Sequence, residues 1–180
     1  MNREEAGRAR RRAAAMLKKA GIVLTPAEED GMEVADLGLG NLERYGLEIV
    51  TYVNNSRYCA KELVLFPGQT CPEHIHPPLG PDNPGKQETF RCRFGTIYLH
   101  IPGEPTPDPK ASVPPGDEAC FTAAREIIIR PGGQVTIPPE TAHWFQAGGD
   151  GAVISEFSST SVDEEDLFTD PRIRRTPVYD

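Results

Sequence analysis

The spacing of apolar and polar residues changes once along the chain, near residue 47. Residues 3–20 begin with acidic residues, continue with Ala, Arg, Leu and Lys, and stop before Gly21, which is typical of one capped helix. A second short helix is predicted from Thr25, because Thr-Pro-Ala-Glu-Glu offers an N-cap, a proline at the first helical position and an acidic first turn. We expect both helices to pack outside the rest of the fold.

After residue 47, short runs rich in β-branched and aromatic residues alternate with turn-forming segments. A Pro-rich loop over residues 102–115 interrupts them. The predicted strands are Leu47–Val53, Cys59–Phe66, Glu73–His76, Lys86–Cys92, Thr96–Ile101, Glu126–Ile129, Gln134–Ile137, His143–Gln146 and Ala152–Phe157. Short strands of this number and spacing favour an all-β fold, a double-sheet jelly-roll barrel.

A chain of 180 residues is long enough to bury the core of one domain. We expect one structural domain with three parts: an N-terminal helical extension (residues 1–46), a barrel (residues 47–158) and a C-terminal tail (residues 159–180). The tail is expected to wrap the barrel or a partner subunit. Because an exposed barrel edge and an N-terminal helix are readily covered by a second copy, we predict a homodimer.

Charge and composition narrow the function. The net charge of −8 argues against nucleic-acid binding, which needs a basic face, and favours small-molecule chemistry. The sequence has neither an apolar leader nor an 18-residue apolar run, so we expect no secretion and no membrane insertion. The four cysteines form no CxxC pair and are interpreted as reduced thiols. These features predict a cytoplasmic location.

Four residues have the pattern of a metal site. His74 and His76 are two apart, a spacing that sends both imidazoles to the same face of a strand. Glu88 shares its parity with Lys86 on the next strand, and His143 opens a later strand across the barrel. Three imidazoles and one carboxylate, with positions left for water or substrate, suit one divalent cation. Mn²⁺ is the expected metal, with Fe²⁺, Co²⁺, Ni²⁺ or Zn²⁺ as alternatives.

The residues around these four resemble the cupin family. The first cupin motif is matched by Gly68, His74-Ile-His76, Glu88 and Gly95, and the second by Gly132, Pro138 and His143. The spacer between His76 and Glu88, Pro77–Gln87, is longer than usual in that motif, and Glu140 and Ala147 replace common residues of the second. The resemblance implies a single cupin barrel, with a long loop beside the metal that shapes substrate access.

A narrower resemblance, from about Cys59 to Arg174, is to the D-lyxose isomerase family of cupins. It is carried by Gly68-Gln69, Pro72, His74, His76, Lys86-x-Glu88, Glu156-Phe157-Ser158, the acidic run Asp163–Asp166 and Phe168. It implies an intramolecular oxidoreductase, a ketol-isomerase that interconverts a free aldose and ketose through an ene-diol. D-lyxose with D-xylulose, or D-mannose with D-fructose, would be the sugar pair.

Lys86 and Glu156 are the candidate acid and base, since the barrel interior could bring their pKa values toward neutrality. Glu88 could act both as metal ligand and as base. Lys86 and Glu156 also have structural interpretations: Lys86 as half of a salt bridge, and Glu156 as a residue at the end of a strand.

Lys61 matches a lysine of the family and, with Asp163 and Arg174, is a candidate for binding sugar hydroxyls. The alternatives are an exposed strand lysine and solvated tail charges.

Two other functions are compatible with this ligand set. A metal-dependent dioxygenase would use Fe²⁺ and O₂ on a small organic substrate, and a noncatalytic cupin would bind a sugar or another ligand. The lysine and carboxylates near the predicted metal favour proton transfer on a polyol over an oxygenase.

Overall fold

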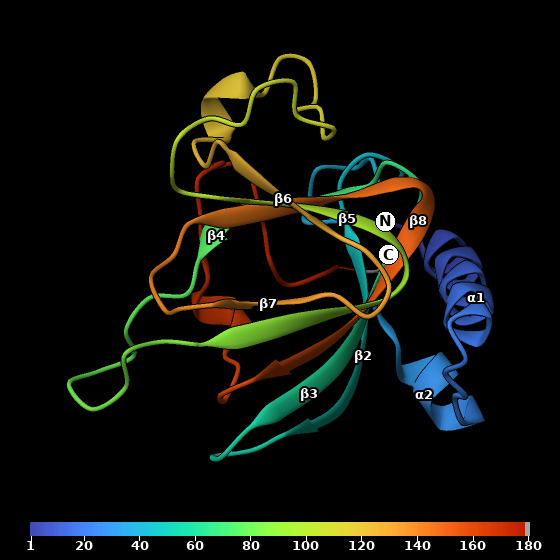
Figure 1. Cartoon of the computed structure of the whole chain (residues 1–180). Coiled ribbons are helices and arrows are strands. Elements are labelled where there is room, and N and C mark those ends of the chain that lie inside the picture. Colours follow the sequence, from blue (N-terminus) through green and yellow to red (C-terminus); the bar gives the residue numbers. More distant parts are fainter. Residues whose placement is uncertain (179–180) are drawn as a thin grey trace.

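The structure, a computed structural model, describes residues 1–178 (Figure 1). Residues 179 and 180, the end of the predicted tail, lie outside the described residues. The helices are α1 (Arg3–Lys19) and α2 (Pro26–Gly31), with 3₁₀ turns η1 (Glu118–Cys120) and η2 (Asp163–Glu165). The strands are β1 (Glu33–Ala35), β2 (Leu47–Asn54), β3 (Cys59–Leu65), β4 (Thr70–Ile75), β5 (Glu88–Ile101), β6 (Arg125–Ile129), β7 (Gln134–Ile137), β8 (His143–Ser158) and β9 (Leu167–Phe168).

Within residues 1–178, nine strands form one curled sheet with both helices on its outside (Figure 1). One path through the sheet runs β1-β2-β3-β8-β4-β9, and β5 pairs with β6, β7 and β8. All of these strand pairs are antiparallel. The predicted all-β barrel with helices packed outside is confirmed.

Two long strands replace four of the predicted short ones. The ladder between β5 and β8 continues through two register shifts, between Cys92 and Phe94 and between Gly95 and Ile97. A Cβ atom at Gly95 would lie 1.9 Å from the carbonyl oxygen of Gly151. The prediction placed breaks where the chain only bends, because glycine allows the two backbones to approach closely.

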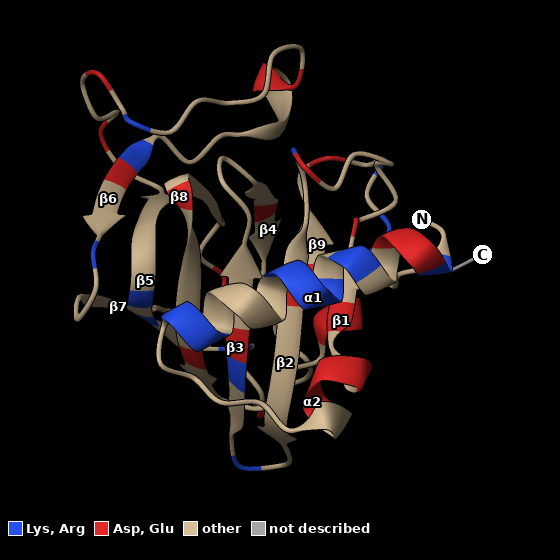
Figure 2. Cartoon of the chain, turned by 90° about the vertical axis from the view of Figure 1, so that its right-hand side faces the viewer, with Lys and Arg blue, Asp and Glu red and all other residues tan. Residues whose placement is uncertain are grey.

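The barrel is filled by one apolar cluster, and a second lies between the sheet and α1. Helix α1 begins with a capping box formed by Asn2 and Glu5, and buries Ala13 and Leu17 against the sheet. Figure 2 shows α1 crossing β2 and β3, with basic and acidic segments along its exposed side. Among the described residues, neither helix has the length and apolarity to span a membrane.

One carboxyl group is buried beneath α1 rather than in the barrel. Glu48 lies on the face of β2 that also carries Val50, a member of the cluster under the helix. Its side chain is fully buried, and its nearest polar partner is Nε2 of Gln69 at 3.4 Å. Burial is the main cause that raises the Glu48 pKa to about 8.

Residues 159–178, called the strap below, follow β8 and supply several residues to the pocket described in the next section. The strap contributes β9, which pairs with β4 at its metal-site end. Beside this pairing, the buried carboxylate of Glu73 accepts hydrogen bonds from the Thr169 hydroxyl of the strap and from the backbone and hydroxyl of Thr122. Glu73 therefore fastens both the strap and the long loop before β6 to the same strand.

Candidate active site

Three strands bring the four predicted metal ligands together. His74 lies in β4 and His76 directly follows it, while Glu88 and His143 open β5 and β8. One ligand atom from each residue lies within 4.8 Å of the others, and all four side chains are buried. The HxH spacing places both imidazoles on the same side, as predicted.

The donor atoms fit a cation. Nε2 of His76, Nε2 of His143 and Oε1 of Glu88 are buried without a hydrogen-bond partner among the described residues. The Oε1 atom lies 2.9 Å from Nε2 of His143 and 3.4 Å from Nε2 of His76. Burial, followed by the neighbouring imidazoles, holds the pKa of His74 well below its usual value. Imidazole nitrogens and a carboxylate oxygen that converge on one point are a donor set that could hold a divalent cation.

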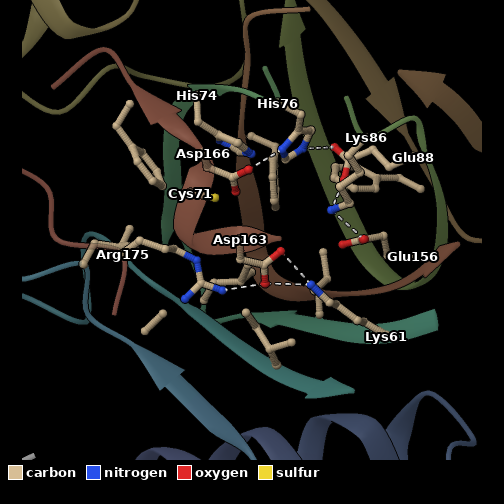
Figure 3. Close-up of a pocket in the computed structure, with 18 residues that line it drawn as sticks. Lys61, Cys71, His74, His76, Lys86, Glu88, Glu156, Asp163, Asp166 and Arg175 are labelled. Carbon is tan, nitrogen blue, oxygen red and sulfur yellow. Dashed lines mark hydrogen bonds and ion pairs between the residues drawn. The ribbon is translucent and has the colours of Figure 1, made fainter. Parts of the chain in front are cut away.

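A buried lysine links this cluster to a second carboxylate. The Lys86 ammonium lies 2.7 Å from Oε2 of Glu88 and 2.7 Å from Oε1 of Glu156 (Figure 3). Burial favours a neutral lysine, but the charges of Glu156 and then Glu88 outweigh it and keep the Lys86 pKa well above its usual value. Burial also disfavours ionised Glu88, yet Lys86 and His143 hold the pKa of Glu88 well below its usual value. Lys86 is therefore a cation between two carboxylates.

A second charged group lies across the pocket, where the strap meets β3. The Lys61 ammonium donates to both carboxylate oxygens of Asp163, at 2.9 and 2.7 Å, and to the Ser161 hydroxyl at 3.1 Å. Arg175 donates to the same carboxylate at 2.9 Å and contacts Glu33 on its other side. Burial alone would raise the Asp163 pKa, but Lys61 and the other nearby cations lower it well below its usual value. Figure 3 shows Asp163 between Lys61 and Arg175.

The strap also reaches a metal ligand. Nδ1 of His76 lies 2.6 Å from Oδ1 of Asp166, which directly follows η2 (Figure 3). Burial opposes protonation of His76, but Asp166 and then Glu88 outweigh it and raise the His76 pKa to about 9.

These groups line one pocket that contains about 470 Å³ of space not filled by atoms, including its part open to solvent. The polar lining residues are His74, His76, Lys61, Lys86, Glu88, Glu156, Asp163, Asp166 and Arg175. The other lining residues are Ala35, Leu37, Leu47, Ile49, Leu63, Cys71, Phe90, Phe145 and Phe168. A cavity with a few converging polar groups on an apolar wall is the usual form of a small-molecule site.

Comparisons with known proteins also point to a sugar isomerase. The family model for D-lyxose isomerase matches residues 103–179. The D-lyxose ketol-isomerase of Cohnella laeviribosi is 61% identical over 172 residues, which covers 96% of this chain and 94% of that protein. The chain belongs to the D-lyxose isomerase family. The D-lyxose/D-mannose isomerase of Thermosediminibacter oceani is also 61% identical, over 161 residues that cover 89% of this chain and 88% of that protein.

Solved structures extend the fold comparison beyond the D-lyxose isomerase family. The L-ribose isomerase of Acinetobacter sp. DL28 in complex with L-ribose superposes with a TM-score of 0.79 at 16% sequence identity. The match covers 96% of this chain and 94% of that chain. At this identity the likeness concerns the fold alone, and it agrees with the predicted cupin barrel.

Most of the site residues predicted for this member of the D-lyxose isomerase family line the pocket. Lys86, Glu88 and Glu156 are adjacent, and Lys61 and Asp163 form a pair beside them. Arg174 differs: it is exposed, it is absent from the pocket lining, and its backbone N–H donates to the Leu37 carbonyl at 2.9 Å. The next residue along the strap, Arg175, lies in the pocket instead. The roles of these residues in catalysis and substrate binding stay predictions.

Sequence reasoning missed Asp166 and Arg175. A signal for Asp166 was present in the acidic run, because residues three apart eclipse on a 3₁₀ turn. Turn η2 spans Asp163–Glu165, so Asp163 and Asp166 both face the pocket while Glu164 is exposed. No comparable signal distinguished Arg175 from Arg174, since the strap has no regular period there.

The remaining histidine has a structural environment. His100 stacks on Trp144 with ring centroids 3.9 Å apart, and its Nε2 lies 3.2 Å from a carboxylate oxygen of Glu126. The Trp144 indole N–H donates to the Ala123 carbonyl. Neither ring lines the pocket, in agreement with the nonligand role expected for His100.

Proposed function

We propose that the protein is a metal-dependent aldose–ketose isomerase that acts on a free sugar. The proposed substrate pair is D-lyxose and D-xylulose, or D-mannose and D-fructose. Family membership supports the reaction class, because the relatives at 61% identity carry the names D-lyxose ketol-isomerase and D-lyxose/D-mannose isomerase.

The observation that carries the proposal is the position of Glu156 beside the metal cluster. Aldose–ketose isomerisation moves one proton from C2 to C1, and a second from the C2 hydroxyl to the carbonyl oxygen on C1. It therefore needs a charge-stabilising centre and a base in one pocket. Here a cluster of unpartnered donor atoms and a carboxylate linked to it through Lys86 share one cavity.

His74, His76, Glu88 and His143 would hold a divalent cation, which would supply Lewis-acid stabilisation of negative charge on the oxygens of the open-chain sugar. Glu156 is the proposed base, which takes the proton from C2 and returns it to C1. A correctly placed base of this kind contributes about 10²- to 10⁴-fold in rate.

Lys86 and Glu88 take other parts in this scheme. Because Lys86 stays protonated between two carboxylates, it acts as a hydrogen-bond donor and a positive charge, not as a base. Glu88 has one oxygen toward the imidazoles and the other at 2.7 Å from Lys86, so both oxygens are engaged. This leaves Glu156 as the better placed base of the two carboxylates.

The charged group on the far side of the pocket is proposed to bind sugar hydroxyls. Lys61 and Asp163 line the same cavity as the metal ligands and offer hydrogen-bond donors and acceptors there. Such groups can orient a polyol chain beside the metal site. Arg174, the third residue predicted for this role, is exposed, and we propose Arg175 in its place.

Mn²⁺ is the proposed metal, since imidazole and carboxylate ligands suit it. Which divalent ion occupies such a site also depends on the affinity of the site for each ion and on the supply of that ion in the cell. A homodimer is proposed because large apolar side chains are exposed, Tyr52 at 44% and Phe157 at 51%. A cytoplasmic location is proposed because all four cysteines are unpaired thiols.

The test is ketose formation from a panel of aldoses, led by D-lyxose and D-mannose, with chelator-stripped protein and added Mn²⁺, Fe²⁺, Co²⁺, Ni²⁺ or Zn²⁺. Metal-dependent ketose production should vanish in His74→Ala. The matched control is His100→Gln, which removes a buried histidine outside the pocket and should keep metal-dependent turnover.

The outcomes separate the isomerase from its alternatives. Protein shown to contain metal but unable to convert any aldose would refute the isomerase. Consumption of O₂ by the Fe²⁺-loaded protein would then favour the dioxygenase, and sugar binding without turnover would favour a noncatalytic cupin.

A further inference from the structure

The three imidazoles of the metal site are oriented in two different ways. Nδ1 of His74 lies 2.9 Å from the Pro72 carbonyl, and Nδ1 of His143 lies 2.9 Å from the Thr141 carbonyl. Each carbonyl stands two residues earlier in the same segment of chain. Donation from Nδ1–H to a carbonyl leaves the Nε2 lone pair free to bind a metal. These two ligands are therefore oriented by their own local backbone.

His76 has no such local partner. Its Nδ1 lies 2.6 Å from the Asp166 carboxylate, which is 90 residues away along the chain and belongs to the strap. A carboxylate that accepts from a ligating histidine fixes the ring and its tautomer and makes the other nitrogen a stronger donor. The geometry of one of the three imidazoles thus depends on the strap, which follows β8 at the C-terminal end of the described chain.

The strap is held near His76 by contacts on both sides of Asp166. On one side, Asp163 accepts hydrogen bonds from Lys61. On the other, β9 pairs with β4, and Thr169 donates through its backbone to the Glu73 carbonyl and through its hydroxyl to the Glu73 carboxylate. Asp166 lies between these anchors, so docking of the strap determines where its carboxylate stands.

We propose that Asp166 is a positioning residue for the metal site, and that metal binding and docking of the strap stabilise each other. The inference rests on the proposed function, because it requires a cation at His74, His76, Glu88 and His143. The coupling is reciprocal by thermodynamic necessity: if the docked strap improves metal affinity, bound metal favours the docked strap by the same factor. The strap also supplies Asp163, Phe168 and Arg175 to the pocket, so metal loading would complete the substrate site as well.

The first experiment compares metal affinity in Asp166→Asn and Glu164→Gln by calorimetric titration of chelator-stripped protein with Mn²⁺. Both variants remove one acidic charge from the same turn of the strap, but Glu164 is exposed and does not contact a histidine. Loss of a carboxylate behind a ligating histidine typically weakens metal binding by about 10- to 100-fold. We expect that loss in Asp166→Asn and wild-type affinity in Glu164→Gln.

The second experiment measures hydrogen exchange of strap amides over residues 160–170, with and without Mn²⁺. Metal should slow exchange in the wild type and in Glu164→Gln, and should slow it much less in Asp166→Asn. A purely structural role for Asp166 would speed exchange equally in the presence and absence of metal and would leave the Mn²⁺ affinity unchanged.

Two results would overturn the inference, and they are distinguishable. Tight Mn²⁺ binding that is equal in wild type and Asp166→Asn, with no metal-dependent protection of the strap, would overturn it alone. A wild-type protein that binds no divalent metal would overturn it together with the proposed function.

Discussion

Two of the regions that bury carboxyl groups give them opposite electrostatic environments. In the pocket, Glu88 and Glu156 both lie 2.7 Å from the Lys86 ammonium, and Lys86 and His143 hold the pKa of Glu88 low. Beneath α1, Glu48 forms no ion pair with any of residues 1–178; the Gln69 amide lies 3.4 Å from its carboxyl group, and burial is the main cause that raises its pKa to about 8.

A buried carboxylate beside a cation can take part in chemistry, whereas a buried carboxyl group without one affects mainly the stability of the fold. Glu88 remains ionised in the barrel because a buried cation accompanies it, and such a buried charged group is costly to desolvate but chemically useful. A carboxyl without a cation avoids its desolvation penalty by remaining protonated. The Glu48 carboxyl is therefore a neutral part of the packing under α1 at neutral pH, and its effect is on folding rather than on catalysis.

The largest effect is expected from Glu156→Gln, which removes the proposed base while preserving shape. The rate kcat should fall by about 10²- to 10⁴-fold, the contribution typical of a positioned base. Mn²⁺ affinity should stay close to the wild-type value, since Glu156 is not one of the four clustered ligands. Steady-state kinetics on D-lyxose and metal titration measure the two quantities, and an unchanged kcat would assign the base elsewhere.

A smaller effect on folding is expected from Lys86→Met, which leaves two buried carboxylates without their cation. Breaking a buried ion pair on one side typically costs about 3–5 kcal/mol of unfolding free energy. Bound Mn²⁺ should recover part of that loss, because it supplies positive charge beside Glu88. Urea unfolding with and without metal tests this, and equal stability of the variant and wild type would show that Lys86 is not needed for charge balance.

The smallest effect is expected from Glu48→Gln. The folded-state pKa of Glu48 is about 8, above the ordinary value of 4.5, so the folded state binds more protons between these pH values. The Glu48 contribution to stability is therefore complete below pH 4.5 and declines as pH rises toward 8, by at most about 1.4 kcal/mol per pH unit.

In Glu48→Gln this decline should disappear, which a series of urea unfolding curves from pH 5 to pH 8 would reveal. Glu29→Gln is the matched control, because Glu29 is exposed and its replacement should leave the pH dependence unchanged. A pH dependence that is identical in Glu48→Gln and wild type would mean that Glu48 is ionised when folded.

The metal ligands could be predicted from sequence because local spacing carries the signal. The two-residue step from His74 to His76 determines a shared face, and Gly68, Gly95 and Gly132 frame the turns of a known barrel family. Strand parity placed Lys86 on the same face as Glu88, whereas Glu156 became a candidate base through the resemblance to the D-lyxose isomerase family.

Other features depended on contacts that no local pattern contains. The continuity of β5 and β8 results from the close approach of Gly95 to Gly151, which are far apart in sequence. The partner of His76 is 90 residues away, and the choice of Arg175 over Arg174 depends on how the strap turns after β9. Such long-range geometry is settled by packing, which periodicity does not describe.

Strand β8 has a consequence for how the protein is made. It pairs with β3, β4 and β5, all of which leave the ribosome before it. Until residues 143–158 emerge, those three strands lack their shared neighbour and present unpaired edges, which invite association with other chains. During synthesis there is therefore a stage at which β2 to β7 have been made but the barrel cannot yet close around β8.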